Sequence, residues 1–134
     1  MEKEIRIIIA GGRDYQDYQT LKTNVDNIIV GLKEKYKSQF NRICIVCGDA
    51  RGADTLGNRY GQQNGLHVYH FPANWKLFGG QAGPVRNAQM ARFSKEDNNI
   101  GVLIAFWDGS SPGTKSMIEL AKEKRLNEVF VIRY

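Results

Sequence analysis

The chain has 134 residues, of which 42% are hydrophobic and 25% are charged, and its formal net charge is +5. This length supports one domain with a real core and is short for two, so we expect a single domain over residues 1–134. No apolar run approaches the roughly 20 residues of a membrane span, and the first four residues are too charged for a signal peptide, which predicts a soluble, cytoplasmic protein without a membrane partner.

The apolar pattern changes period repeatedly along the chain, and each change falls at a glycine or proline. A helix is predicted to begin after Asp17, a candidate N-cap, and to run to about residue 36. The segment 72–83 is predicted to be irregular. Short apolar runs predict strands at 5–10, 43–47, 67–71, 100–107 and 128–133, and helical spacing predicts further helices at 53–64, 84–93 and 114–125.

This order of elements predicts an α/β fold. Strands that alternate with helices form a parallel sheet covered on both faces, because right-handed crossovers allow little else. We expect a Rossmann-like three-layer sandwich with five strands in the order 3-2-1-4-5, which places the first and fourth strands side by side. The loops after these two strands then face each other across a crevice, where ligands bind in open α/β sheets.

The loop after the first strand reads Gly11-Gly12-Arg13-Asp14. Its glycines let the backbone approach a ligand closely, while Arg13 and Asp14 offer a cation and an acceptor. Two glycines also suit an ordinary tight turn, and both interpretations stay open here. The loop lacks the GxGxxG fingerprint, and no Gly-Lys-Ser/Thr triplet marks a P-loop, so classical NAD and Walker-type sites are disfavoured.

The loop after the second strand, residues 48–54, carries Arg51 and Asp54 on either side of two small residues. Arg51 could hold a phosphate or carboxylate, and Asp54 could cap its own helix or accept a hydrogen bond from a ribose hydroxyl. Alternatively, the two residues form a pair that only stabilises the turn. Because Asp49 adds a negative charge to this loop, we expect a phosphate to lie elsewhere.

The loop at residues 110–114 is the better phosphate site. It leads through Gly113, Thr114 and Lys115 into a helix, whose N-terminal N–H groups and dipole favour an anion. The simpler alternative is a turn with Thr114 as N-cap. Glu119 lies in the second turn and could reach the crevice, although a glutamate there is more often a solvated residue.

Segment 72–87 is unusually long for a strand-to-helix connection, and such loops are often functional. Trp75 and Phe78 could stack on a nucleobase, and Arg86 and Asn87 follow on the next helix. The alternative is that the two aromatic rings only plug the end of the sheet.

Cys44 and Cys47 form a Cys-x-x-Cys pair, but strand alternation sends them to opposite faces. We therefore interpret them as small buried residues rather than as a redox or zinc site. His67 and His70 lie within the third strand and are more typical of structural residues than of catalytic ones. No metal site is predicted.

Five motifs together carry a family resemblance: Gly11-Gly12-Arg13-Asp14, Gly48-x-Ala50-Arg51-Gly52-Ala53-Asp54, Pro72-Ala73-x-Trp75, Ala82-Gly83-x-x-Arg86-Asn87-x-x-Met90 and Gly113-Thr114-Lys115-x-Met117-Ile118. They resemble the small YspA/YpsA-related branch of the SLOG superfamily, which also includes the LOG cytokinin-activating phosphoribohydrolases and the Rossmann-like domain of the DNA-processing protein DprA. The resemblance runs over nearly the whole chain. It implies a Rossmann-like sheet, the binding and in some branches the cleavage of nucleotides or nucleotide-derived signals, and a homodimer or higher homo-oligomer.

The chain departs from the resemblance at two places. Cys47 and Asp49 replace a serine and a glycine of the branch's usual Ser-Gly-Gly-Ala-Arg-Gly-Ala-Asp loop. The LOG enzymes carry Pro-Gly-Gly-x-Gly-Thr-x-x-Glu, whereas here Met117 is the third residue after Thr114 and Glu119 lies two residues beyond it. Because each helical residue turns by roughly 100°, Glu119 points in another direction, and LOG-type hydrolysis is not supported.

The leading hypothesis is a protein that binds a nucleotide or a nucleotide-derived signal at the C-terminal ends of the strands, with no further cofactor. A hydrolase or N-glycosidase acting on such a ligand is the first alternative, with Asp14, Asp54 and Glu119 as the acid or base candidates. Single-stranded nucleic-acid binding, as in DprA, is a less favoured alternative that the positive charge supports. The predicted ligand-binding residues are Gly11, Gly12, Arg13, Asp14, Gly48, Arg51, Asp54, Trp75, Arg86, Asn87, Gly113, Thr114 and Lys115.

Overall fold

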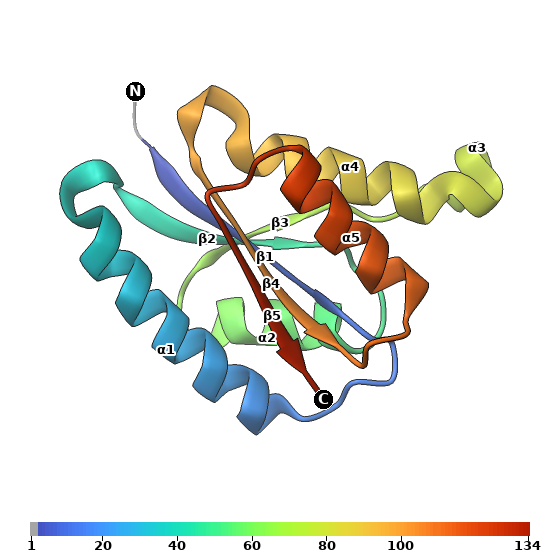
Figure 1. Ribbon diagram of the computed structural model, residues 1–134, viewed down its shortest axis with the longest axis horizontal. Helices are drawn as coiled ribbons and strands as arrows, with labels where there is room; N and C mark the ends of the chain where they lie inside the picture. The colour runs from blue at the N-terminus through green and yellow to red at the C-terminus, as the bar shows by residue number, and fades with distance from the viewer. Residues whose placement is uncertain (1–2) are drawn as a thin grey trace.

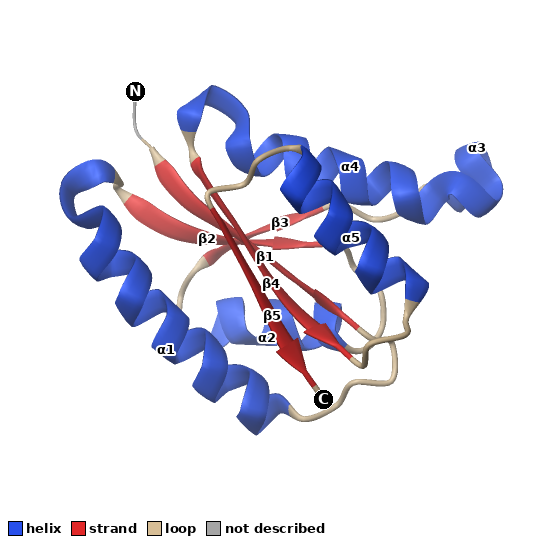
Figure 2. Cartoon of the chain, viewed as in Figure 1, coloured by secondary structure: helices blue, strands red, loops and turns tan. Residues whose placement is uncertain are grey.

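A five-stranded parallel sheet forms the centre of the structure, a computed structural model that describes residues 3–134. Its strand order, β3-β2-β1-β4-β5, confirms the predicted α/β Rossmann-like arrangement and the order 3-2-1-4-5. Figure 2 shows this sheet with helices on both sides. The strands are β1 (Glu4–Gly11), β2 (Arg42–Cys47), β3 (His67–His70), β4 (Ile100–Trp107) and β5 (Glu128–Arg133).

Two pairs of helices cover the two faces of the sheet (Figure 1). The first pair, α1 and α2, packs on the face that carries Ile7 of β1, and the second pair, α4 and α5, packs on the face that carries Ile8. Because β1 and β4 are buried on both faces, their sequences are almost continuously apolar. These helices are α1 (Tyr18–Tyr36), α2 (Ala53–Gln63), α4 (Ala82–Lys95) and α5 (Pro112–Glu123).

The helix ends follow local capping chemistry. Asp17 caps α1 as predicted, because its side chain accepts a hydrogen bond from the N–H of Thr20 at 3.1 Å. The helix α5 begins at Pro112, two residues earlier than predicted, with Ser111 at the N-cap. Proline suits this first helical position because the N–H that it lacks has no helical partner there. The alternative that Thr114 is the N-cap is therefore wrong.

The segment predicted to be irregular is mostly helical. A short helix, α3 (Trp75–Phe78), follows Asn74, whose side chain accepts a hydrogen bond from the N–H of Leu77 at 3.0 Å. A 3₁₀ turn, η2 (Gly79–Gln81), then leads directly into α4. The prediction for residues 72–83 is wrong because a four-residue helix carries too little apolar periodicity to be seen. Two further 3₁₀ turns are η1 (Lys37–Gln39) and η3 (Glu96–Asn98).

The helices of residues 3–134 do not include one that is both long enough and apolar enough to cross a membrane.

Glycines let the loops after β1 and β2 pack against each other and against β4. A Cβ atom on Gly11 would lie 2.4 Å from the carbonyl oxygen of Phe106. Gly52 has a φ of +78°, and a Cβ atom there would lie 2.2 Å from the carbonyl oxygen of Gly12. The N–H of Ala53 donates to that same oxygen at 3.2 Å. The glycines thus bring the start of α2 to the C-terminal edge of the sheet.

Candidate functional site

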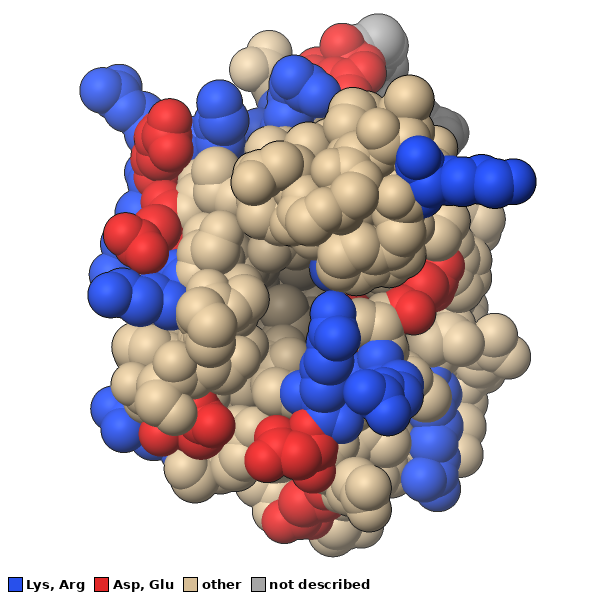
Figure 3. Space-filling model, turned by 90° about the vertical axis from the view of Figure 1, so that its right-hand side faces the viewer, with Lys and Arg blue, Asp and Glu red and all other residues tan. Residues whose placement is uncertain are grey.

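A cavity of about 670 Å³ lies where the loops after β1 and β4 face each other, as the strand order predicts. The helices α4 and α5 and the start of α2 complete its walls. Figure 3 shows this face of the molecule hollowed near its centre, with Lys or Arg side chains on one rim and uncharged surface on the opposite one. The predicted residues that line the cavity are Gly11, Gly12, Arg13, Asp14, Asp54, Trp75, Arg86, Asn87, Gly113 and Thr114.

The remaining predicted residues lie elsewhere. Gly48 and Arg51 line a smaller hollow of about 330 Å³ that shares Arg13 and Arg86 with the main cavity. Lys115 and Glu119 are exposed on α5 and line neither space. The buried face of α5 carries Thr114, Met117 and Ile118, and the turn of roughly 100° per residue places Lys115 and Glu119 on its exposed side.

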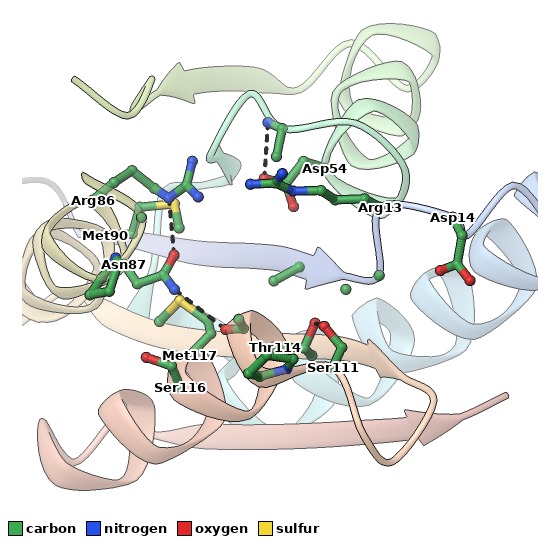
Figure 4. A pocket seen from close by; sticks show the side chains of 18 of the residues that line it. Arg13, Asp14, Asp54, Arg86, Asn87, Met90, Ser111, Thr114, Ser116 and Met117 are labelled. Carbon is green, nitrogen blue, oxygen red and sulfur yellow. Dashed lines mark hydrogen bonds between the residues drawn. The ribbon is translucent and has the colours of Figure 1, made fainter. Parts of the chain in front are cut away.

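Arg86 is the buried cation of the site, with only 8% of its surface exposed. Its guanidinium donates one hydrogen bond to the carbonyl oxygen of Gly48 and another, of 3.0 Å, to Oδ1 of Asn87. Asn87 in turn donates to the carbonyl oxygen of Gly113 at 3.5 Å. This chain of hydrogen bonds, drawn in part in Figure 4, ties α4 to the loop after β2 and to the start of α5. All of these acceptors are neutral, and no ion pair to Arg86 forms within residues 3–134.

Asp54 places a buried carboxylate in the cavity wall. It is 6% exposed, and its Oδ2 accepts a hydrogen bond of 3.2 Å from the N–H of Ala50. Burial raises the pKa of Asp54 to about 6, although the Ala50 N–H and the charge of Arg86 act in the opposite direction. Figure 4 shows the side chain of Arg13 extended toward Asp54. No ion pair joins Asp54 to Arg51 among residues 3–134, and the alternative of a turn-stabilising pair is not supported.

The N-terminus of α5 forms the opposite wall. The N–H groups of Gly113 and Thr114 have no hydrogen-bond acceptor within the described part of the chain, while that of Lys115 donates to Ser111. Thr114 is buried, and its Oγ1 lies 3.4 Å from Oγ of Ser111. Two free N–H groups at the positive end of a helix dipole are suited to an anion.

Asp108 holds the loop before α5 in place. Its Oδ1 accepts hydrogen bonds of 2.8 Å from the N–H groups of Ser110 and Ser111, which lowers the pKa of Asp108. These two N–H groups are therefore already occupied. Sequence reasoning did not single out Asp108, although an aspartate followed by Gly-Ser-Ser is typical of such a side-chain-closed turn.

Asp14 lines the cavity but faces away from Asp54 in Figure 4. Its Oδ1 accepts a hydrogen bond of 2.9 Å from the hydroxyl of Tyr134. Burial, together with this bond, raises the pKa of Tyr134 to about 12. Asp14 is thus engaged at the rim of the cavity, away from the buried groups.

Trp75 stands at the mouth of the cavity on α3, and 53% of its surface is exposed. Phe78 on the same helix is 39% exposed and lines neither space. Figure 1 shows α3 projecting beyond the end of the sheet. The exposure of both rings contradicts the alternative that they only plug the end of the sheet, and it leaves the ring of Trp75 accessible to a ligand.

The structure brings together a second group of side chains that the sequence analysis did not predict to meet. Cys47, Asp49 and His70 meet beside the smaller hollow, which Asp49 also lines. They meet because β2 and β3 pair in parallel with Cys47 opposite His70. Cys44 lies three residues earlier on β2, opposite Arg6 of β1 and His67 of β3, and is not part of this group. Only the register of β2 and β3 would have predicted that these residues meet, and the periodicity of a sequence does not give the register.

The comparisons with known proteins give one match. A family model described as the YspA, cpYpsA-related SLOG family (YAcAr) matches residues 5–78. This match spans more than half of the chain, and the chain therefore belongs to this family. It includes the loops after β1 and β2 and also Trp75, whereas α4 and α5 lie outside it. No curated protein and no solved structure matches the chain.

Proposed function

We propose that this member of the YspA, cpYpsA-related SLOG family binds a nucleotide or a nucleotide-derived ligand in the 670 Å³ cavity. One observation carries the proposal: within residues 3–134, two N–H groups at the start of α5 have no acceptor and the buried Arg86 makes no salt bridge, and all of these groups line the same cavity. A phosphate group is the ligand chemistry that both would bind, because it is anionic and accepts several hydrogen bonds. The volume lies within the range of small-molecule sites.

The cavity offers groups for both the phosphate and the base of such a ligand. The phosphate would accept hydrogen bonds from the N–H groups of Gly113 and Thr114. Arg86 and Arg13 would neutralise its charge from the opposite side, and the exposed ring of Trp75 would stack on the base. Lys115 leaves the proposed binding set because it does not line the cavity.

Cleavage of the bound ligand is a second candidate function, which one feature favours. Asp54 is a buried carboxylate in the cavity wall, and its raised pKa, about 6, would let it take or give a proton near neutral pH. The other acid or base candidates are less suitable, since Asp14 is bonded to Tyr134 and Glu119 lies outside the cavity.

Mass spectrometry can separate the two functions. The purified chain would be incubated with nucleoside mono- and diphosphates and with dinucleotides, and both the retained and the released compounds would be identified. Binding without cleavage predicts one unchanged compound retained at close to one equivalent. Cleavage predicts product release that stops in Asp54→Asn. If none of the phosphate compounds is retained and none is converted, both functions are contradicted.

A further inference from the structure

Three different metal-ligating groups meet at the ends of β2 and β3. They come from Cys47, Asp49 and His70, and their donor atoms all lie within 4.8 Å of one another. Nδ1 of His70 is 2.7 Å from Oδ1 of Asp49, and Sγ of Cys47 is 3.2 Å from that same oxygen. Within residues 3–134, this is the one such group of three or more side chains.

The backbone positions all three donors. The parallel register places Cys47 opposite His70 at the last pair of β2 and β3. Asp49 has a φ of 59°, in the left-handed region, which aspartate tolerates better than most residues with a Cβ atom. The turn brings its N–H to 3.4 Å from Sγ of Cys47, and its carboxylate back toward the end of the strand.

We propose that Cys47, Asp49 and His70 bind a zinc ion through Sγ, a carboxylate oxygen and Nδ1. A thiolate, a carboxylate and an imidazole are all common zinc ligands, and the soft thiolate disfavours Mg²⁺ and Ca²⁺. On binding, the thiol of Cys47 releases its proton to solvent. The thiolate and the carboxylate then balance the two positive charges of the ion, and the histidine stays neutral.

The two separations that involve Asp49 require little rearrangement. Zinc–ligand bonds of about 2.0–2.3 Å in a tetrahedron place neighbouring donor atoms roughly 3.3–3.7 Å apart. The 3.2 Å separation between Cys47 and Asp49 is close to this range. The 2.7 Å contact between Asp49 and His70 must open by about 0.6 Å, and the His70 side chain can move because it is 44% exposed.

The surroundings define the rest of the coordination shell. Sγ of Cys47 is buried, while Asp49 and His70 are exposed, so the ion would enter from the side of these two residues. Burial raises the pKa of the Cys47 thiol to about 12, and the N–H of Asp49, directed at Sγ, acts in the opposite direction; the charge of a bound zinc ion would further favour the thiolate. Three protein ligands leave a fourth position for water or for an anion from the smaller hollow, which Asp49 lines together with three arginines.

Cobalt binding by the full chain tests this site. The protein would be freed of metal, kept reduced and titrated with Co²⁺, whose tetrahedral thiolate complexes absorb visible and near-ultraviolet light. The expected result is one equivalent of Co²⁺ with a thiolate-to-cobalt band, which one equivalent of Zn²⁺ displaces. The band should be absent in Cys47→Ser, and His70→Gln should weaken binding at least tenfold, since even the loss of an outer-shell partner costs about that much.

The same two strands supply matched controls. Cys44→Ser and His67→Gln remove the other cysteine and the other histidine, which lie outside the group, and both variants should bind Co²⁺ like the parent chain. Absence of the band in the reduced parent protein would overturn the proposal, as would its persistence in Cys47→Ser or an equal loss in the controls. If Cys47→Ser does not fold, the exposed His70→Gln variant decides the result, and unchanged affinity there refutes the site.

Discussion

Charged side chains are buried at both ends of the sheet, but their interaction partners differ between the two ends. At the N-terminal ends of the strands, Glu4 accepts hydrogen bonds from Arg6 at 2.8 Å, from Arg42 at 2.5 Å and from Tyr69. At the C-terminal ends, within residues 3–134, Arg86 donates only to neutral oxygens and Asp54 accepts only from a backbone N–H. One end holds a closed ionic cluster, and the other holds a cation and a carboxylate that act on each other through their charges without forming a salt bridge.

The difference shows which buried charges belong to the fold and which are available to a ligand. A buried charge carries a desolvation cost that a partner charge and hydrogen bonds can offset. Glu4 has this compensation within the chain, whereas Arg86 keeps its charge beside a cavity. We therefore expect substitutions in the Glu4 cluster to change stability and substitutions at Arg86 to change binding.

The largest effect should come from Glu4→Ala, which leaves Arg6 and Arg42 without their shared acceptor. We expect the free energy of unfolding to fall by about 3–5 kcal/mol, because removing one partner of a buried ion pair leaves the other uncompensated. Urea denaturation would measure the loss. The control is Glu34→Ala, at a side chain that is 80% exposed, where a change comparable to that of Glu4→Ala would refute the distinction.

Lowering the pH should also reduce the free energy of unfolding of the parent chain, because it protonates Glu4. Burial alone would raise the pKa of Glu4, but hydrogen bonds from Arg6, Arg42 and Tyr69 outweigh it and lower the pKa from 4.5 to about 2. The folded state therefore binds this proton less tightly than the unfolded state. The stabilisation is complete above about pH 5 and disappears as the pH falls toward 2, a loss of roughly 3 kcal/mol. Urea midpoints measured across this range should lose this component in Glu4→Gln.

At the cavity end, Arg86→Met should weaken binding, and it should cost less stability than Glu4→Ala. The substitution removes a buried charge that makes no salt bridge, but it leaves the acceptors of Gly48 and Asn87 without their donor, so we expect a loss of about 1–3 kcal/mol, smaller than that of Glu4→Ala. Affinity for a phosphate-bearing nucleotide should fall at least tenfold, or about 1.4 kcal/mol. Calorimetry would measure both quantities. Arg92→Met is the matched control on the exposed side of α4, and an equal loss of affinity there would mean that net charge alone matters.

The smallest effects should come from Lys115→Ala and Glu119→Gln. Both side chains are exposed on α5 outside the cavity, so we expect affinity within about twofold of the parent chain and no change in any cleavage. A tenfold loss in either variant would show that α5 presents a different face to the ligand.

Most of the fold follows from the chain pattern in physical terms. Alternation of apolar runs with helical spacing requires parallel strands with crossovers. The strand order was an expectation from this fold class and is not fixed by the apolar runs, because β2 is as fully buried as β1 and β4. The glycine loops mark the edge where the cavity lies. The N-cap at Asp17 was also predictable, because its side chain accepts a hydrogen bond from an N–H group only three residues further along the chain.

What could not be predicted depends on contacts between segments that lie far apart in the sequence. The meeting of Cys47 and His70 requires the register of two strands, and the burial of Arg86 requires the position of Gly48. The position of Lys115 and Glu119 outside the cavity depends on how α5 packs against the sheet, with Met117 buried. Local pattern does not give these contacts between segments.

The most direct test of the proposed nucleotide site is the affinity of Thr114→Asp for nucleoside phosphates, measured by calorimetry. A carboxylate at this position would lie beside the free N–H groups and repel a phosphate. Thr23→Asp makes the same change on the exposed surface of α1, away from the cavity. We predict that Thr114→Asp folds but loses at least tenfold in affinity while Thr23→Asp binds normally. Normal binding by Thr114→Asp would contradict the assigned phosphate position.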